Sequence, residues 1–244
     1  MSKNNLRSYS LSIVIPMVNE IKSLKKTLKI LSLIKCKKEY LIIISKKLTT
    51  KNNQLELKNL NKKYFNLFTF FQKKKFVGGA IIKGIQKSRN THIVIMAADM
   101  ETNPYDLKKM VSISKLNLET IISGDRWIYK DSFKKYNLLK LLVNYLAQKI
   151  IRLIFKATIN DFTFAYRIYP RKILSQFKIS ELRHGFALEM IIKPIKLGYK
   201  VINFPTKWKV RTEGVATSSV FNYYSFSKVL ISSRNSKLGI GSYS

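Results

Sequence analysis

Acidic residues, cysteine and histidine are all scarce in this sequence, and each scarcity argues against a class of site. One cysteine, Cys36, cannot form an internal disulfide, and with only two histidines a zinc site built from Cys and His is not expected. The sequence has 13 acidic residues and 46 lysines and arginines, which gives a formal net charge of +33. Such an excess is typical of proteins that bind nucleic acid, anionic membranes or phosphorylated ligands. Because the charge is spread evenly and no nucleic-acid recognition module is evident, we expect no nucleic-acid partner.

Long apolar runs are also missing, and none approaches the ~20 residues that a membrane-spanning helix needs. The nearest is LLKLLVNYLAQKIIRLIF, residues 138 to 155, where Lys140, Asn144, Gln148 and Arg152 recur every fourth position. On a helix this spacing makes a narrow polar seam and a broad apolar face. Two interpretations are open: a helix packed into the core, which we favour, or a helix lying in a membrane interface with its cations near the headgroups.

The first 20 residues lack the basic region, long apolar region and small-residue cleavage site of a signal peptide. We therefore expect a cytoplasmic protein, with peripheral contact at the cytoplasmic face of a membrane if the second interpretation of residues 138 to 155 holds.

Short Ile- and Val-rich runs alternate with stretches of helical character. Strands are predicted at 11–16, 40–45, 65–71, 92–97 and 120–124, and helices at 20–34, 53–63, 79–89 and 104–116. This alternation predicts an α/β fold with a mostly parallel sheet and helices on both faces. We expect one domain over residues 9–215, followed by a C-terminal helix and a loose Ser/Gly-rich tail over 216–244.

Polar side chains follow several of the predicted strands. They are Pro16, Asn19 and Glu20 after the first strand, Asp99 and Glu101 after the fourth, and Asp125 and Arg126 after the fifth. The carboxyl ends of parallel strands meet at one edge, where ligands of such sheets bind. Carboxylates beside an arginine at that edge suit a phosphate bridged by a hard divalent cation. Asp99 is too far from the helix near Pro104 to be its cap, so a metal role is favoured over a simple turn.

The motifs resemble a known family along about nine tenths of the chain. SIVIPMVNE is similar to the opening strand and loop of family 2 glycosyltransferases of the GT-A fold, and IVIMAADMETNP to their D-x-D loop. GDRW, INDFTFAYRIYP and HGFALEMIIKPIKLGYKVINFPTKWKVRTEG then follow in the order of the polyprenyl-phosphate, dolichyl-phosphate mannosyltransferase-like branch. Each motif is weak alone, but together and in order they form a strong resemblance.

The resemblance implies an inverting glycosyltransferase that moves a sugar from a nucleotide-sugar donor to a polyprenyl phosphate or a related cell-surface glycan. It implies that Asp99 and Glu101 hold Mg²⁺ or Mn²⁺ against the donor diphosphate and that Arg126 meets phosphate near the acceptor. Further catalytic or donor-binding positions implied in this way are Asp161, Arg167 and Arg211, with Pro16, Asn19, Glu20 and Gly79 on the donor side. A separate membrane subunit is a further candidate partner, because the sequence shows no membrane-spanning run of its own.

Several of these residues carry a second interpretation. Arg167 could pair with Asp161, Gly79 could serve helix packing instead of phosphate binding, and Glu189 could form a buried pair with an arginine. A phosphate acceptor is already an anion and needs no base; Asp161 is the best candidate if one is required.

The chain also departs from the family pattern. Ala97 stands where the first D-x-D aspartate is usual, and Ser45, Lys46 and Lys47 replace acids that usually follow the second strand. Asp99 with Glu101, and not two aspartates, is therefore predicted to carry the cation. Two other functions remain open: a catalytically altered relative that binds lipid or a partner enzyme and, less favoured, a basic nucleic-acid-binding protein.

Overall fold

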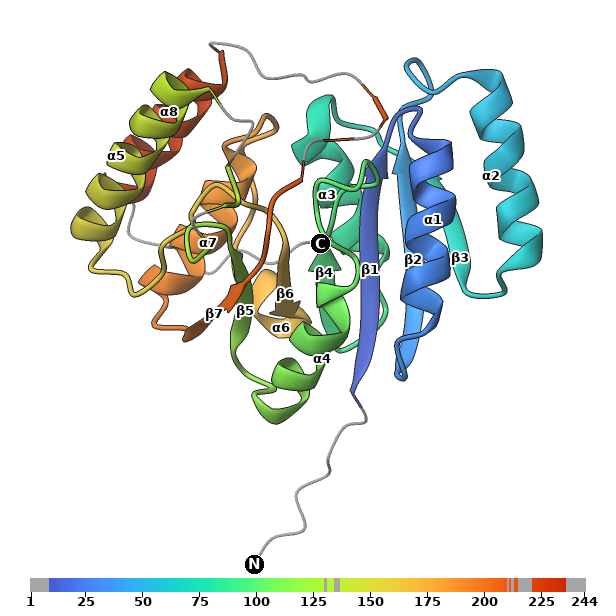
Figure 1. The fold of residues 1–244 in the computed structure, drawn as a ribbon, viewed down its shortest axis with the longest axis horizontal. Helices are drawn as coiled ribbons and strands as arrows, with labels where there is room; N and C mark the ends of the chain where they lie inside the picture. Colours follow the sequence, from blue (N-terminus) through green and yellow to red (C-terminus); the bar gives the residue numbers. More distant parts are fainter. Residues whose placement is uncertain are drawn as a thin grey trace, which may run out of the picture.

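One seven-stranded sheet organises the computed structural model, which describes residues 9–129, 131–133, 137–209, 211, 213–214 and 221–235 (Figure 1). Its strands are β1 (Ser10–Met17), β2 (Lys37–Ile44), β3 (Leu67–Phe71), β4 (His92–Ile95), β5 (Ile121–Asp125), β6 (Arg167–Pro170) and β7 (Val201–Pro205). The order is β3-β2-β1-β4-β6-β5-β7, and all neighbours are parallel except β6, which runs antiparallel between β4 and β5. The predicted α/β class and mostly parallel sheet are confirmed.

The five predicted strands are confirmed, whereas β6 and β7 have no counterpart among the predicted strands. Each is only four or five residues long and includes a proline, and β6 begins with an arginine, so neither makes the apolar run that identifies a buried strand. Their strand conformation comes from pairing with β4 and β5.

Helices cover both faces of the sheet (Figure 1). They are α1 (Ile21–Ser32), α2 (Lys51–Lys63), α3 (Phe76–Lys87), α4 (Asp106–Leu116), α5 (Leu138–Phe155), α6 (Arg171–Leu174), α7 (Phe186–Lys196) and α8 (Phe221–Asn235). One core layer lies under α1, α2 and α4, and the other under α3 and α7. Strand β1 serves both layers because successive side chains point to opposite faces: Ile13 and Ile15 enter the first layer and Val14 the second.

The helix predicted at 138–155 is α5, but the favoured prediction that it packs into the core is wrong. Nine of its large apolar side chains are exposed, from Leu153 at 83% to Val143 at 42%, while Gln148 and Ile151 are buried. The helix contacts the rest of the protein through a narrow strip that combines two residues of the polar seam, Asn144 and Gln148, with apolar Ile151 and Phe155. Among the described residues, no helix is long and apolar enough to cross a membrane.

The C-terminal helix expected after residue 216 is α8, and it packs against α7. The Gly185 amide donates to Ser225 Oγ at 2.8 Å, and Val229 is buried in the second core layer. The predicted tail, residues 236–244, lies outside the described residues.

Candidate functional site

The loop after β4 turns two carboxylates toward one place. Met100, between Asp99 and Glu101, has a left-handed backbone with φ of +68°, which costs about 1–2 kcal/mol for a residue other than glycine. The Glu101 amide donates to Asp99 Oδ1 at 3.1 Å, and Thr27 Oγ1 lies 3.2 Å from the Met100 sulfur. An extended chain would send side chains 99 and 101 to the same face but farther along it; this turn instead folds them together.

Arg211 joins these two carboxylates although it lies 110 residues from Glu101 in the chain. Its Nε and Nη2 lie 2.9 and 2.8 Å from Glu101 Oε1, and Nη2 lies 3.7 Å from Asp99 Oδ2. The neighbouring Glu213 accepts a 2.8 Å hydrogen bond from the Ser23 amide at the start of α1, which fixes this segment over the sheet edge. The structure thus brings together three residues that the sequence analysis placed in one site.

Asp99 is electrostatically strained at this position. Burial raises its pKa from 3.8 to about 6, and the nearby carboxylates of Glu101 and Glu20 act in the same direction, against the Glu101 amide and Arg211. Converging carboxylates whose negative charge is poorly compensated are what a divalent cation stabilises, and one or two of them suffice when substrate phosphates complete its shell. Within the described ranges no group of three or more His, Cys, Asp and Glu side chains has metal-holding geometry. The residues present therefore fit a cation shared with substrate and water, not a cage made by protein alone.

The loop after β1 forms the neighbouring wall. Glu20 accepts hydrogen bonds from the amides of Val18 and Asn19 at 2.8 and 3.0 Å, and Gly214 packs against it so closely that a Cβ there would lie 2.5 Å from Glu20 Oε1. Asn19 is held by the Leu48 carbonyl, the Thr50 amide and the Asn53 side chain. Pro16 lies within β1, opposite Ile43 of β2. Asn19 and Glu20 thus shape the loop, and Pro16 lies in the strand just before it; the contact of these three residues with a donor stays a prediction.

Packing explains the glycine pair at the start of α3. A Cβ on Gly78 would lie 2.6 Å from the Glu181 carbonyl oxygen, and one on Gly79 would lie 2.3 Å from that of Lys74. The Gly78 amide donates to the Leu182 carbonyl at 2.7 Å, so it is already engaged. The packing interpretation of Gly79 is thus supported by direct contacts, and its donor-binding role is untested.

Arg126, at the end of β5, is held by Asp161 in a two-pronged ion pair. Its Nε and Nη2 lie 2.7 and 2.9 Å from the two carboxylate oxygens, and Nη2 also donates to Thr163 Oγ1 at 3.1 Å. The Phe164 ring lies 4.5 Å below the guanidinium carbon. Burial would raise the pKa of Asp161, but the Arg126 charge outweighs it and holds that pKa below its usual range. Asp161 is therefore engaged in orienting Arg126, and its candidacy as a base stays a prediction.

Arg167 does not face a substrate, which corrects its predicted catalytic role. Its side chain is fully buried and donates to Ser123 Oγ, the Ala187 carbonyl and the Asp161 carbonyl at 2.7–2.9 Å. It meets the backbone of Asp161 and not the carboxylate, so the alternative of a side-chain ion pair is also wrong. Arg167 ties β6 to β5 and to α7, beneath Arg126.

Glu189 has a structural role, and its cation is a lysine where an arginine was one expectation. It accepts from both the amide and hydroxyl of Ser180, from the Glu181 amide, and from Lys193 Nζ at 2.6 Å. This network fixes the turn before α7, and with it His184. Burial and then the Arg211 charge lower the pKa of His184, while Glu101 opposes them, so the neutral imidazole lies near the carboxylates. No functional role for His184 was predicted from the sequence, because a single histidine before a helix carries no local signal of its partners.

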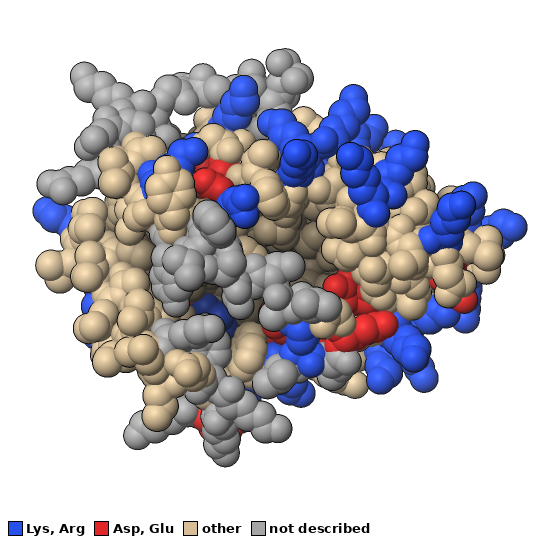
Figure 2. Space-filling view, turned by 90° about the horizontal axis from the view of Figure 1, so that it is seen from above, with Lys and Arg blue, Asp and Glu red and all other residues tan. Residues whose placement is uncertain are grey.

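The rest of this edge is strongly basic. Figure 2 looks down on it and shows Lys and Arg side chains gathered over the right-hand half, where Figure 1 places α1, α2 and β3. Exposed Lys46 and Lys47 follow β2, and exposed Lys73, Lys74 and Lys75 follow β3. Ligands with several negative charges are therefore favoured here.

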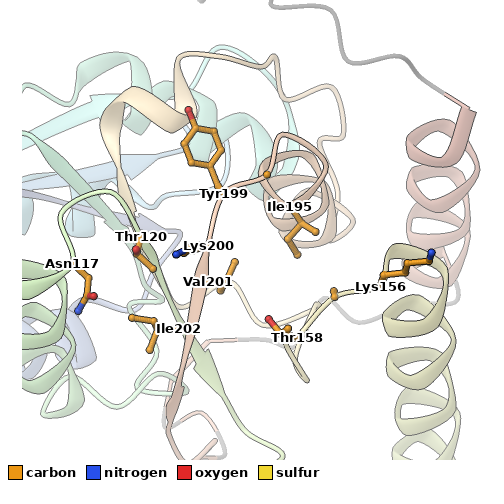
Figure 3. Close-up of a pocket in the computed structure, with 11 residues that line it drawn as sticks. Asn117, Thr120, Lys156, Thr158, Ile195, Tyr199, Lys200, Val201 and Ile202 are labelled. Carbon is orange, nitrogen blue, oxygen red and sulfur yellow. The ribbon is translucent and has the colours of Figure 1, made fainter.

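A cavity of about 410 Å³ lies at the opposite edge, where β5 and β7 begin (Figure 3). Thr120, Lys200 and Val201 contribute to its wall, and no carboxylate or histidine does. The carboxylates and arginines that could bind a cation or a phosphate lie at the carboxyl edge of the sheet. We therefore assign the functional site to that edge.

Comparison with solved structures agrees with this assignment of fold. Glucosyl-3-phosphoglycerate synthase from Mycobacterium tuberculosis in complex with Mg²⁺ and UDP superposes with a TM-score of 0.70 at 12% identity, over 92% of this chain and 79% of the other. The same enzyme with Mn²⁺, UDP and phosphoglyceric acid gives 0.67 at 11% identity, over 93% and 79%. The fold is that of the GT-A nucleotide-sugar glycosyltransferases.

The sequence itself identifies the family. The model of glycosyl transferase family 2 matches residues 12–177, which include most of β1, the Asp99 loop, Arg126 and Asp161. This chain belongs to glycosyl transferase family 2.

Proposed function

We propose that this glycosyltransferase uses a divalent cation, Mg²⁺ or Mn²⁺, to bind a nucleoside diphosphate sugar at the carboxyl edge of β1 and β4. The observation that carries the proposal is the convergence of Asp99 and Glu101 on Arg211, with the pKa of Asp99 raised to about 6. When bound, the cation would offset charge on the departing diphosphate. The Mg²⁺, Mn²⁺ and UDP of the similar mycobacterial enzyme support the same assignment.

Arg211 changes partners in this proposal. Without a cation its guanidinium neutralises Asp99 and Glu101; with a cation on those carboxylates, it turns to the donor phosphates beside them. A guanidinium suits both tasks, because carboxylates and phosphates accept the same two-pronged hydrogen bonds.

The acceptor in this proposal carries a phosphate that Arg126 binds. An acceptor oxygen attacks the anomeric carbon from the side opposite the diphosphate. The nucleoside diphosphate leaves with the bonding electron pair, and the configuration at the anomeric carbon is inverted. A phosphate oxygen is already anionic and needs no base. Consistent with this, Asp161 is engaged with Arg126, and the other nearby aspartate, Asp125, is fully buried against Asn160 and the Trp127 amide.

We further propose a polyprenyl phosphate as the acceptor, with its chain toward α5. The Thr163 hydroxyl accepts from both Arg126 and Gln148 of α5 at 3.1 Å, so the phosphate-binding arginine adjoins a helix whose outer face is apolar. The phosphoglyceric acid of the mycobacterial enzyme is a water-soluble alternative with the same phosphate chemistry.

A two-stage experiment tests this function. A panel of nucleotide sugars is first screened by thermal shift with Mn²⁺ or with EDTA; the donor should raise the melting temperature only with the metal. Transfer from that donor is then measured with polyprenyl phosphate, phosphoglycerate or no acceptor. Glu101→Gln should abolish the metal-dependent shift, and the control Glu56→Gln, which alters an exposed ion pair with Lys25, should keep it.

Each result decides a separate part of the proposal. If the donor still raises the melting temperature in EDTA, the proposed role of the cation in donor binding is wrong. If the sugar is transferred to phosphoglycerate and not to polyprenyl phosphate, the proposed lipid acceptor is wrong, but the protein is still a glycosyltransferase. Binding of a donor without transfer to any phosphate acceptor refutes the assignment of Arg126.

A further inference from the structure

Helix α5 differs from an ordinary surface helix, because most of its large apolar side chains are exposed while the polar Gln148 is buried. Gln148, from its polar seam, is only 4% exposed; its Oε1 accepts from the Phe162 amide at 2.8 Å, and its Nε2 donates to Asn144 and Thr163. The leucines on the other side face solvent, among them Leu153 at 83% and Leu146 at 51%. A surface helix normally buries its apolar side and exposes its polar side.

The exposed apolar side chains share one face of the helix, which Lys149 also enters. Successive residues of a helix are rotated by ~100°, so the nine exposed apolar residues fall within about half of the circumference. Gln148, Ile151 and the half-buried Asn144 occupy the other half. A largely apolar face of this size on a protein surface is typical of an interaction site.

The positive charge around this apolar face indicates which kind of partner binds it. The sequence of α5 contains no acidic residue, and exposed Lys149 and Arg152 accompany its apolar face. Helix α8, drawn at the same end of the molecule in Figure 1, also has no acidic residue. A second copy docked face to face would bring like charges together, whereas an anionic surface would be attracted. The whole chain, at +33, has the same preference.

We propose that α5 docks this enzyme on an anionic membrane, lying in the interface with its apolar face toward the acyl chains. Lys149 and Arg152 then lie near the headgroups, and Gln148 holds the helix to the protein body. Docking would place the Arg126 region next to the bilayer, because Gln148 and Arg126 share Thr163. The inference concerns where the enzyme works and needs no donor, cation or acceptor.

Flotation of the full chain with lipid vesicles tests it. The probes are vesicles of phosphatidylcholine alone and of phosphatidylcholine with phosphatidylglycerol, at low and high salt. The chain should float with the anionic vesicles, less so at high salt. The variant Leu146→Gln with Leu153→Gln should bind at least about tenfold more weakly, because two inserting side chains lose their apolar burial without any change of charge.

The matched control changes two leucines of similar exposure elsewhere, Leu33→Gln with Leu116→Gln, which are 71% and 85% exposed at the ends of α1 and α4. It should bind as the unchanged chain does. All four leucines are exposed, so far-ultraviolet circular dichroism should show every variant folded. The proposal is overturned if the unchanged chain floats with neither vesicle, if the α5 variant floats as well as the control, or if the α5 change abolishes only self-association in sedimentation.

Discussion

Replacing Asp99 by asparagine should stabilise the metal-free protein at neutral and alkaline pH while removing its cation site. Asparagine has the same shape, and its side-chain oxygen can still accept the 3.1 Å hydrogen bond from the Glu101 amide. It carries no charge, so the repulsion from Glu101 and Glu20 and the cost of burying a carboxylate both disappear.

The size and sign of the effect follow from the pKa of Asp99. Each pKa unit corresponds to about 1.4 kcal/mol, so the rise from 3.8 to about 6 amounts to roughly 3 kcal/mol. Because the pKa is raised, the folded state binds the proton of the Asp99 carboxyl group more tightly than the unfolded chain does. Its stabilising contribution is therefore complete below about pH 4 and is lost as the pH rises through about 6. This rise already includes the opposing attraction of Arg211 at 3.7 Å. Because solvent reaches part of the carboxyl group and screens it, we expect a gain of about 1–3 kcal/mol at pH 8.

Urea denaturation in EDTA measures this difference directly. At pH 8 the Asp99→Asn variant should have the higher free energy of unfolding, and near pH 4 the two proteins should agree. Added Mn²⁺ should stabilise only the unchanged chain. Asp131→Asn, in an exposed ion pair with Lys207, is the control and should stay within about 1 kcal/mol at both pH values. A variant less stable than the unchanged chain at pH 8, or equally shifted at both pH values, would refute the electrostatic reasoning.

Three further substitutions probe other parts of the molecule. Arg211→Gln should tighten Mn²⁺ binding in calorimetry without nucleotide, because the guanidinium no longer competes for the carboxylates, and should weaken binding of the donor. Asp161→Asn should lower the free energy of unfolding by about 2–4 kcal/mol and raise KM for the acceptor, since it leaves the largely buried Arg126 without its carboxylate. Gly84→Ala should cost about 1–3 kcal/mol, because its Cβ would lie 2.2 Å from Val14 Cγ1.

Each has an outcome that contradicts it. Weaker Mn²⁺ binding by Arg211→Gln would mean that the arginine supports the cation instead of competing with it. An unchanged KM in Asp161→Asn would separate Arg126 from the acceptor. If the Gly84→Ala cost arises from collision with Val14, adding Val14→Ala should reduce the extra loss in a double-mutant cycle, and simple additivity would exclude that cause.

Asp99 and Glu101 were recognisable because an Ile-rich buried strand ends just before them, and local periodicity identifies such strands. Arg167 was misjudged because its role was inferred from the resemblance of its motif, and an arginine gives no local sign of its own burial; only the pairing of β6 with β4 and β5 encloses it. The strands β6 and β7 were missed for the same reason, since their conformation depends on distant partners.

The sequence by itself determined the α/β alternation, the parallel sheet, the strand-end position of the site and the amphipathic pattern of residues 138 to 155. These are local properties, set by the period of apolar residues and by the residue types at strand ends. Only the tertiary structure decided that Arg211 meets Asp99 and Glu101, that Asp161 serves Arg126, and that α5 turns its apolar side outward. Those contacts join residues far apart in the chain, and no local pattern encodes which side of a helix its neighbours will cover.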